Sequence, residues 1–355
     1  MTPLPPRTAI VILNWNGEKM LRRFLPSVVK QCPHDAIVVV ADNGSTDHSL
    51  EVLRQDFPSV YVEKLKENFG FAEGYNRALS REEIGRITEY DYLDYFVLLN
   101  SDVEVSADWL QPLTRFMDEH PDAAACQPKL RAEGQRDYFE YAGAAGGYLD
   151  RYGYPYCRGR VFSTVERDEG QYDTPAPVLW ATGAALLIRR KDWEESGGLD
   201  GRFFAHMEEI DLCWRLRARG HDIFCIPQSV VYHVGGGTLN AGSPHKTFLN
   251  FRNNLFMLYK NLPERDLRPV MRMRCFLDYV AAAKMLLTDG PSHAAAVLRA
   301  RREYKARRHE FRPQREENLR LSTGKPIAEI LPASLLWLYY ARGRKTFARL
   351  RGVEG

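Results

Sequence analysis

Several short patterns that mark nucleotide-binding enzymes are missing from this sequence. No GxGxxG segment follows the first apolar run, which argues against a dinucleotide-dependent dehydrogenase, and the absence of GxxxxGK[ST] argues against P-loop phosphoryl transfer. The six cysteines form no CxxC pair, so we expect reduced thiols of the cytosol rather than zinc or disulfides. Because no run of 18 apolar residues and no basic-then-apolar N-terminus occur, we expect neither a membrane-spanning helix nor export.

Charge is distributed unevenly along the 355 residues. Residues 1–235 contain 26 Lys and Arg against 36 Asp and Glu, whereas residues 236–355 contain 23 against 10, giving net charges of −10 and +13. The overall composition, 45% apolar and 27% charged, is ordinary for a globular protein. A basic segment joined to an acidic body indicates an anionic partner, either lipid headgroups or nucleic acid, although a solvated basic surface without a partner has the same composition.

Short apolar runs alternate with segments of helical periodicity in the first third of the chain. The pattern predicts strands at 8–13, 36–41, 60–65 and 95–99, helices at 18–30 and 49–55, and a glycine-rich turn that opens a further helix at 67–78. This alternation is typical of an open, mostly parallel α/β sheet flanked by helices.

Polar residues follow three of these strands at the point where each ends, at 14–17, 42–46 and 100–102. Ligands of parallel α/β sheets bind outside the carboxyl ends of the strands, so we expect the three segments to share one crevice. Asp102 would suit a hard cation that clamps a diphosphate there. Taken alone, residues 97–105 favour a strand followed by a simple Asx turn, in which Asp102 only satisfies local amides.

Residues 121–180 are rich in Gly, Tyr and Pro without clear periodicity, which predicts long loops over the crevice. Their aromatic residues would suit the apolar face of a sugar ring, and ordinary surface loops with a hairpin are the alternative. A strand with small residues at its centre is expected at 179–188, because small side chains let a ligand or another backbone approach closely.

Three acids, Glu208, Glu209 and Asp211, fall in the first turn of a helix expected to end at Gly220. Acids at this position interact favourably with the helix dipole, which by itself accounts for them. Their mutual repulsion also raises the pKa of one carboxyl, which is how a general base can be created. His233, just before three glycines, is either a turn residue or a metal ligand.

Together, these segments resemble the motifs of the inverting family 2 nucleotide-sugar glycosyltransferases, especially their rhamnosyltransferase-like bacterial members. The matching segments are 11–17, 39–47, 68–76, 98–102, 183–188, 208–215 and 232–237. Each is weak alone, and their order and spacing make the set specific. The resemblance implies a GT-A fold with a catalytic domain at 1–240, divided into a nucleotide-sugar half (about 1–105) and an acceptor half (about 106–240).

The resemblance also implies roles for individual positions. Asp102 would bind a divalent metal, Mg²⁺ or Mn²⁺, that bridges the diphosphate, and His233 would complete the metal shell. The catalytic base would be Glu209, which stands where the family usually has Asp, with Glu208 and Asp211 as the alternatives. Asn14 and Asp42 would hold the nucleoside, within a nucleotide-sugar site formed by Asn14, Asn16, Asp42, Asn43, Gly70, Asn76, Asn100 and Gly183.

Residues 241–355 are expected to form a basic, mainly helical C-terminal region. Residues 271–287 mix apolar with basic side chains, as in an interfacial amphipathic helix, and residues 331–345 repeat this aromatic-plus-basic pattern. We expect peripheral attachment of this region to the inner face of the cytoplasmic membrane, where polyprenyl-diphosphate-linked acceptors lie. Packing on the catalytic domain or a homodimer interface is the alternative, and nucleic acid is disfavoured because no recognition module accompanies the charge.

These features predict a cytoplasmic, metal-dependent, inverting glycosyltransferase. It would move a sugar from dTDP-rhamnose or a UDP-sugar to a saccharide hydroxyl, in the synthesis of a cell-surface polysaccharide. A catalytically inactive scaffold of the same fold is the first alternative, although the intact Asp42, Asp102 and Glu209 argue against it. A sugar nucleotidyltransferase is the second, and the sequence lacks the GxGTR-like N-terminal loop that such an enzyme needs.

Overall fold

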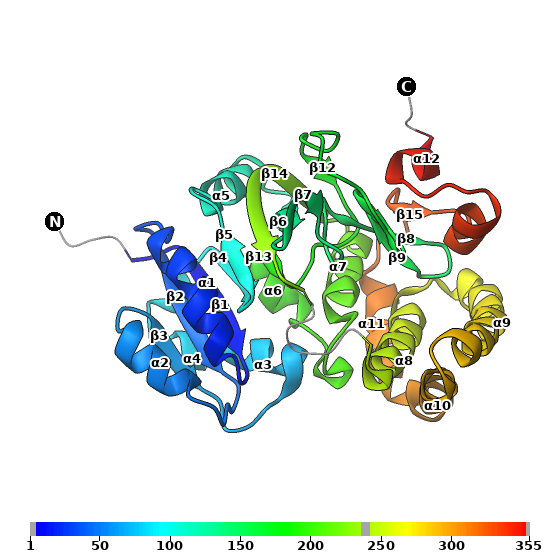
Figure 1. Cartoon of the computed structure of the whole chain (residues 1–355), viewed down its shortest axis with the longest axis horizontal. Coiled ribbons are helices and arrows are strands. Elements are labelled where there is room, and N and C mark those ends of the chain that lie inside the picture. The colour runs from blue at the N-terminus through cyan, green and yellow to red at the C-terminus, as the bar shows by residue number, and fades with distance from the viewer. Residues whose placement is uncertain (1–4, 236–241, 353–355) are drawn as a thin grey trace.

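The structure, a computed structural model, describes residues 5–235 and 242–352. Among these residues, ten strands form a central sheet of order β12-β14-β6-β13-β4-β1-β2-β3, with β5 paired to β14 and β7 to β6. Its strands are β1 (Thr8–Asn14), β2 (Ala36–Asp42), β3 (Tyr61–Lys64), β4 (Tyr95–Asn100), β5 (Val103–Val105), β6 (Ala123–Ala132), β7 (Gln135–Phe139), β12 (Ala176–Pro177), β13 (Ala185–Arg189) and β14 (Asp222–His233). The sheet runs through the middle of the molecule (Figure 1).

The N-terminal part of the sheet follows the predicted pattern. Strands β1, β2, β3 and β4 are parallel, and the apolar run of β1 is almost wholly buried. In this register Asn14 lies opposite Asp42, and Leu13 lies opposite Asn100. The predicted polar segments therefore end at one edge of the sheet, and the mostly parallel α/β fold is confirmed. Strand β13 is the exception in the middle, since it is antiparallel to β4 and β6.

The loops predicted for residues 121–180 are wrong. Strand β6 lies inside the central sheet, and a second sheet of order β11-β10-β9-β8-β15 forms nearby. Tyr148, Tyr156 and Trp180 are buried, so these aromatic side chains offer no platform to a sugar. A strand that is covered on both faces lacks the alternation of polar and apolar residues from which a strand is recognised in a sequence, so the pattern did not predict these strands. The second sheet comprises β8 (Gly147–Asp150), β9 (Pro155–Cys157), β10 (Arg160–Val161), β11 (Thr164–Val165) and β15 (Ile330–Leu331).

Helices flank the central sheet and make up most of the C-terminal region. The α-helices of the described residues are α1 (Glu18–Lys30), α2 (Ser49–Asp56), α3 (Gly70–Ala78), α4 (Arg81–Ile84), α5 (Leu110–Glu119), α6 (Arg190–Ser196), α7 (Glu208–Ala218), α8 (Pro244–Asn261), α9 (Glu264–Thr288), α10 (Pro291–Arg307), α11 (Arg312–Leu321) and α12 (Phe347–Arg351). Short turns of other helix types are η1 (Tyr90–Tyr92), η2 (Gly201–Phe203), η3 (Arg308–Phe311) and η4 (Trp337–Ala341). None of these helices combines the length and apolar composition needed to cross a bilayer.

The C-terminal region packs on the rest of the chain. Strand β15 pairs with β8 in the second sheet, and Tyr339 hydrogen-bonds Thr164 at 2.7 Å. Helices α8 and α11 lie against α7, while α9 and α10 lie further out (Figure 1). The packing alternative of the sequence analysis therefore holds for part of this region. The predicted domain boundary at residue 240, and Gly236 and Gly237 of the last motif, lie outside the described residues.

Helix α9 places charged side chains in the interior. Arg274 and Asp278 are buried and paired at 3.1 Å, and Arg301 from α10 reaches the other oxygen of Asp278. Arg274 also donates to the carbonyl of Tyr152 at 2.8 Å. The contact between α9 and its neighbours thus depends on one buried carboxylate shared by two arginines.

We expect Asp278→Ala to lower the free energy of unfolding by about 3–5 kcal/mol, because it leaves buried cations without their partner. Urea denaturation followed by circular dichroism measures this change. Asp266→Ala, at an exposed position of the same helix, is the control and should shift stability by less than about 0.5 kcal/mol. Equal unfolding midpoints for the two variants would contradict the assigned role of Asp278.

Candidate active site

The ends of β1 and β2 hold a buried amide–carboxylate pair. Asn14 donates through Nδ2 to Asp42 Oδ1 at 3.2 Å and to Ser45 Oγ at 3.3 Å, and Asp42 Oδ2 accepts from the backbone N–H of Ser45 at 3.1 Å. Asn14 Oδ1 is buried and has no hydrogen-bond partner among the described residues. A buried acceptor without a donor is costly, so this oxygen is suited to receive a donor from a ligand.

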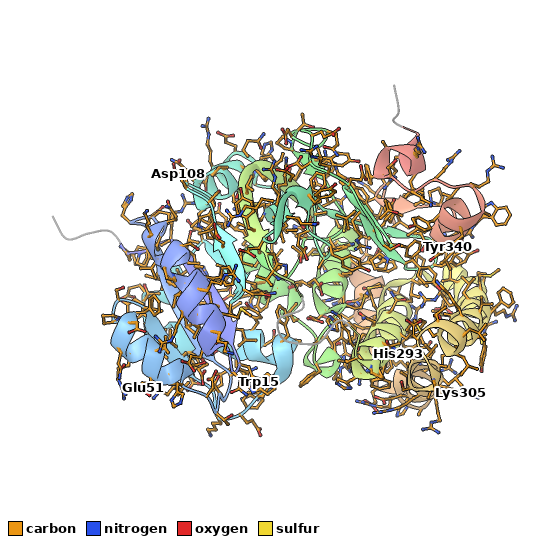
Figure 2. The ribbon with its side chains drawn as sticks, in the orientation of Figure 1. Trp15, Glu51, Asp108, His293, Lys305 and Tyr340 are labelled. Carbon is orange, nitrogen blue, oxygen red and sulfur yellow. The ribbon has the colours of Figure 1, made fainter. Side chains whose placement is uncertain are left out.

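Asn16 and Trp15 lie beside this pair. The side-chain oxygen of Asn16 accepts from the backbone N–H of Thr46 at 2.8 Å and so fixes the turn after β2. Trp15 is 41% exposed and lies at the same end of the sheet (Figure 2). A flat, partly exposed indole next to buried polar groups is an uncommon combination on a protein surface.

Asn43, Gly70 and Asn76 stabilise the surrounding loops. Asn43 donates to the carbonyl of Gly70 at 3.0 Å and accepts from the N–H of Phe69 at 3.0 Å. Gly70 has a φ of +77°, and a Cβ there would lie 2.5 Å from the ring of Phe204, so glycine is required. Asn76 bonds both backbone groups of Leu199, at 2.7 and 2.9 Å. These three residues shape the site through the backbone.

A buried carboxylate and imidazole face each other where β4 and β14 end. Asp102 Oδ1 lies 3.1 Å from His233 Nε2, and Asn100 Nδ2 lies 3.5 Å from the same nitrogen. On the other side of the ring, His233 Nδ1 lies 3.3 Å from Glu140 Oε1. Glu140 is itself held by the N–H of Ala142 at 2.7 Å. The imidazole therefore lies between two carboxylates.

This arrangement changes the pKa values of both partners. Burial opposes the charged forms, but the neighbouring carboxylates of Asp102 and Glu140 together outweigh it and raise the pKa of His233 to about 10. For Asp102, burial raises the pKa of the carboxyl, but the hydrogen bond and charge of His233 together with backbone hydrogen bonds outweigh it, so this pKa lies below the ordinary value. Without a ligand, the pair is an ion pair.

The residues at this position fit a divalent cation. A histidine that binds a metal usually has its second ring nitrogen held by a carboxylate, as Glu140 holds His233 here. One carboxylate oxygen and one imidazole nitrogen suit Mn²⁺ better than Mg²⁺. In the described part of the chain, no group of three or more His, Cys, Asp or Glu is arranged to hold a metal. Further ligands would therefore come from a phosphate-bearing substrate and water.

Two acids with unpartnered oxygens begin α7. Oε2 of Glu208 and Oε2 of Glu209 are buried and have no hydrogen-bond partner among the described residues. Burial and the neighbouring Glu209 raise the pKa of Glu208 well above its ordinary value, and burial raises that of Glu209 to about 7. Of the two carboxyls, Glu208 therefore loses its proton at the higher pH.

Gly183 connects these acids to the strand ends. A Cβ at Gly183 would lie 3.8 Å from Cβ of Glu209, and the neighbouring Ala184 accepts a hydrogen bond from the N–H of Asn100 at 3.0 Å. Gly183 therefore lies between the start of α7 and the strand that carries Asn100. Glycine is favoured at this junction because a Cβ would come within 2.9 Å of the ring of Phe71, which packs against it.

Asp211, the third acid, has different surroundings. It is fully buried and receives Lys260 Nζ at 2.7 Å, Asn261 Nδ2 at 2.8 Å and Arg215 Nε at 3.1 Å. Lys260 also reaches Asp200 at 2.8 Å. Both oxygens of this carboxylate are therefore engaged by donors from the protein. These contacts favour a structural role over the catalytic one predicted from the sequence.

The turn before α7 has unusual backbone geometry. Phe204, His206 and Met207 have φ values of +66°, +71° and +73°, which non-glycine residues adopt at a cost of order 1–3 kcal/mol each. Asn253 of α8 opposes this strain, because its Nδ2 lies within 2.9 Å of the carbonyl oxygens of Phe203, Ala205 and His206. The backbone just before Glu208 is therefore fixed by a side chain from the C-terminal region.

Comparison with known proteins decides the family. The family described as Glycosyl transferase family 2 matches residues 9–194, which is more than half of the chain. The chain belongs to glycosyltransferase family 2. It is 29% identical over 233 residues to an N-acetylglucosaminyl-diphospho-decaprenol L-rhamnosyltransferase of Mycobacterium tuberculosis, covering 63% of this chain and 75% of that one. It is 22% identical over 225 residues to rhamnosyltransferase WbbL of Escherichia coli K12, covering 63% and 82%.

Solved structures agree on the fold of this glycosyltransferase. GalNAc-T7, solved with UDP, GalNAc and Mn²⁺, superposes with a TM-score of 0.58 at 16% identity, covering 96% of this chain and 56% of that one. Residues 1–349 of TarS from S. aureus, solved with UDP-GlcNAc, superpose with a TM-score of 0.52 at 17% identity, covering 88% and 89%. At this level of identity the likeness establishes the GT-A fold alone.

Three residues that support the candidate site or its surroundings were absent from the sequence-based prediction: Glu140, Asn253 and Lys260. Glu140 lies in a stretch predicted to be loop, and the other two lie beyond the matched motifs. Each acts on a partner at least 47 residues away in the chain. No local pattern marks such a residue.

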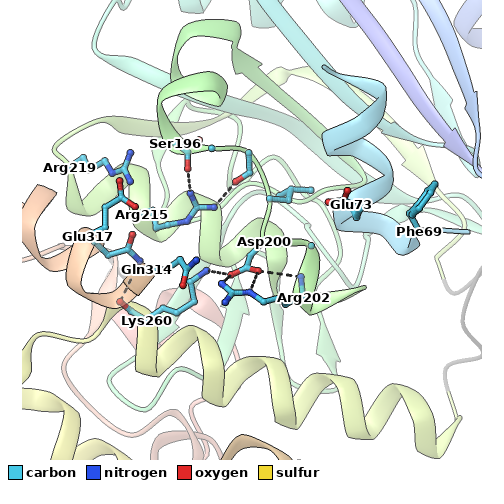
Figure 3. A pocket seen from close by; sticks show the side chains of 15 residues that line it. Phe69, Glu73, Ser196, Asp200, Arg202, Arg215, Arg219, Lys260, Gln314 and Glu317 are labelled. Carbon is cyan, nitrogen blue, oxygen red and sulfur yellow. Dashed lines mark hydrogen bonds and ion pairs between the residues drawn. The ribbon is translucent and has the colours of Figure 1, made fainter. Parts of the chain in front are cut away.

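A polar pocket of about 620 Å³ lies apart from the strand ends, between α7, α11 and the turn at 196–202 (Figure 3). Its cations are engaged by the protein, since Arg215 donates to the carbonyls of Ser196 and Gly198 and Lys260 pairs with Asp200. Of the described residues that line it, none is a predicted site residue. In this glycosyltransferase the pocket marks the junction of α7 with the C-terminal region.

We expect Asn253→Ala to lower the free energy of unfolding by about 1–3 kcal/mol, because buried carbonyls of the strained turn lose their donor. Amide hydrogen exchange should also become faster around residues 203–209. Asn250→Ala, on the same helix at a position without a described side-chain hydrogen bond, is the control. If both variants showed wild-type stability and exchange, the turn would not depend on Asn253.

Proposed function

We propose that this glycosyltransferase moves a sugar, with inversion, from a nucleotide-diphosphate donor to a saccharide hydroxyl. The observation that carries the proposal is a contact path along one sheet edge. It joins the Asp102–His233 pair, through Asn100, Ala184 and Gly183, to the unpartnered acid Glu209. This path supports a diphosphate site next to a candidate base, which is the arrangement that direct displacement needs.

The donor favoured by the relatives is dTDP-rhamnose, because two of them are named rhamnosyltransferases. A UDP-sugar is the alternative, since structures of the same fold contain UDP or UDP-GlcNAc. We assign the nucleoside to the Asn14–Asp42 pair, where the free oxygen of Asn14 can accept from the base or ribose. The exposed ring of Trp15 offers a face on which a pyrimidine can stack.

Asp102 and His233 would hold Mn²⁺ or Mg²⁺ between the protein and the diphosphate. When bound, such an ion neutralises negative charge that develops on the departing nucleoside diphosphate. Asn100 lies close to His233 Nε2 and can orient the ring or a phosphate oxygen. Glu140 keeps the imidazole in place from the opposite side.

Glu209 is our choice for the base. Its pKa of about 7 leaves a large ionised fraction at neutral pH, while the more deeply buried Glu208, whose pKa is raised well above its ordinary value, keeps its proton. In the reaction, Glu209 takes the proton from the acceptor hydroxyl as that oxygen attacks the anomeric carbon and the bond to the diphosphate breaks. Attack opposite the leaving group inverts the anomeric centre, and no covalent intermediate on the enzyme is required.

For the acceptor, we propose a saccharide on a polyprenyl diphosphate, in cell-surface polysaccharide synthesis at the inner face of the cytoplasmic membrane. The name of the Mycobacterium tuberculosis relative, which specifies an N-acetylglucosaminyl-diphospho-decaprenol substrate, supports this acceptor class. A catalytically inactive scaffold is the alternative function, and it would show neither metal-dependent donor turnover nor nucleotide binding.

We expect release of nucleoside diphosphate from dTDP-rhamnose, in a panel with UDP- and GDP-sugars, to require Mn²⁺ or Mg²⁺ and to stop with EDTA. Asp102→Asn should lower this rate about 100-fold or more, because charge stabilisation worth several kcal/mol is lost. Asp137→Asn, at an exposed position, is the matched control. Full activity of Asp102→Asn would refute the metal assignment. Calorimetry with dTDP and UDP would separate a missing acceptor from an inactive scaffold.

The pH profile tests the base. Since Glu209 must be ionised to accept a proton, kcat/KM should rise with pH through about 7 and then level off. Glu209→Gln should lower the rate about 10²–10⁴-fold and remove this ionisation from the profile. Glu195→Gln, an exposed acid on α6, should behave like wild type. If Glu209→Gln kept the same acidic limb, another group would be the base.

A further inference from the structure

The distribution of polar and apolar side chains on helix α9 is the reverse of that on an ordinary surface helix. Its inner face carries the buried Arg274 and Asp278, between Val270 and Ala282, which are also buried. A helix on the surface of a globular protein normally turns its apolar stripe inward and its charged residues outward. Here the polar pair is enclosed, and several apolar side chains of α9 are left on the other face.

The outer face of α9 is a continuous apolar stripe. Met273, Phe276, Val280, Ala283 and Leu287 recur at three- and four-residue spacing, which places them on one side of the helix. All five are exposed, Phe276 to 63% and Leu287 to 86%. Apolar side chains in contact with water along the length of a helix are unfavourable and indicate a surface that another apolar phase covers.

A second segment, η4, continues this face. Trp337 and Tyr340 are exposed to 63% and 61%, whereas Tyr339 between them is buried against the second sheet. Lys284 Nζ of α9 lies 5.3 Å from the ring centre of Tyr340, so the two segments are neighbours. Figure 2 shows Tyr340 on the outside of the molecule near α9. The name α9–η4 surface is used below for Met273, Phe276, Val280, Leu287, Trp337 and Tyr340.

Most charged side chains around the α9–η4 surface are cations, with one exposed acid, Asp289, just beyond the end of α9. Arg272 and Lys284 flank the stripe on α9, and Arg342, Arg344 and Lys345 follow η4, all of them exposed. Between residues 267 and 288 the only acid is Asp278, which is buried and paired, and residues 330–352 contain none. Two copies of this face would bring like charges together, whereas an anionic surface complements them.

We propose that the α9–η4 surface docks on a membrane that carries anionic lipid. Its aliphatic and aromatic side chains would enter the boundary between headgroups and acyl chains, and the flanking cations would contact the headgroups. Trp and Tyr suit this boundary because each has an apolar ring with a polar atom. Binding to lipid requires no nucleotide sugar, so this proposal can fail or succeed independently of the proposed transfer.

The test is co-sedimentation of the full chain with vesicles of phosphatidylcholine alone or mixed equally with phosphatidylglycerol. Wild type should bind the mixed vesicles, and less so at high salt because the headgroup attraction is screened. Phe276→Ser combined with Leu287→Ser should weaken binding about tenfold or more. Tyr92→Ser combined with Leu298→Ser, which removes exposed apolar side chains elsewhere, is the matched control and should bind like wild type.

Thermal unfolding checks that both double variants are folded, which is expected because all four positions are exposed. Wild type that stays in the supernatant with mixed vesicles, or equal binding by the two double variants, would overturn the proposal. Sedimentation velocity of the wild type and of the Phe276→Ser with Leu287→Ser variant measures the oligomeric state. A wild-type dimer that Phe276→Ser with Leu287→Ser dissociates would make this face a contact between copies, which also overturns it.

Discussion

The start of α7 depends on one buried carboxylate, that of Asp211. Its oxygens receive Lys260 and Asn261 from α8 and Arg215 from its own helix. A charge at this depth is stable only while its partners are in place. Glu208 and Glu209 lie in the same first turn of α7, so their positions follow from how this helix is anchored. The C-terminal region thereby contributes to the geometry of the site, although it lies outside the segment that matches the family.

The sequence pattern predicted correctly those strands that are apolar runs ending in polar residues. Asn14, Asp42 and Asn100 could be placed at one edge because parallel strands share their direction, and the register bears this out. It failed for residues 121–180, where Tyr148 and Trp180 are core residues. Glycine and proline interrupt the short strands there, and burial on both faces removes the alternation from which a strand is recognised.

The partners of the candidate site were harder to predict than its principal residues. Glu140 supports His233, and Asn253 holds the turn before Glu208, yet neither belongs to a motif. These residues contact backbone carbonyls or a ring nitrogen of residues that are distant in the sequence and that only the fold brings close to them. Asp211 shows the converse, because its place among three acids predicted a catalytic role, whereas its contacts are those of an ion-pair network. The sequence shows where an acid stands in the chain, but it does not show which side chains surround that acid in the fold.

The pairing of β15 with β8 has a consequence for how the chain can be divided. Strand β8 has β9 on one side and β15, from near the C-terminus, on the other. A fragment ending soon after the family-matched segment would leave the backbone of β8 unpaired along that side. An open strand edge is a template for pairing between molecules, so the fragment would tend to aggregate. The family-matched segment and the C-terminal region should therefore be expressed together.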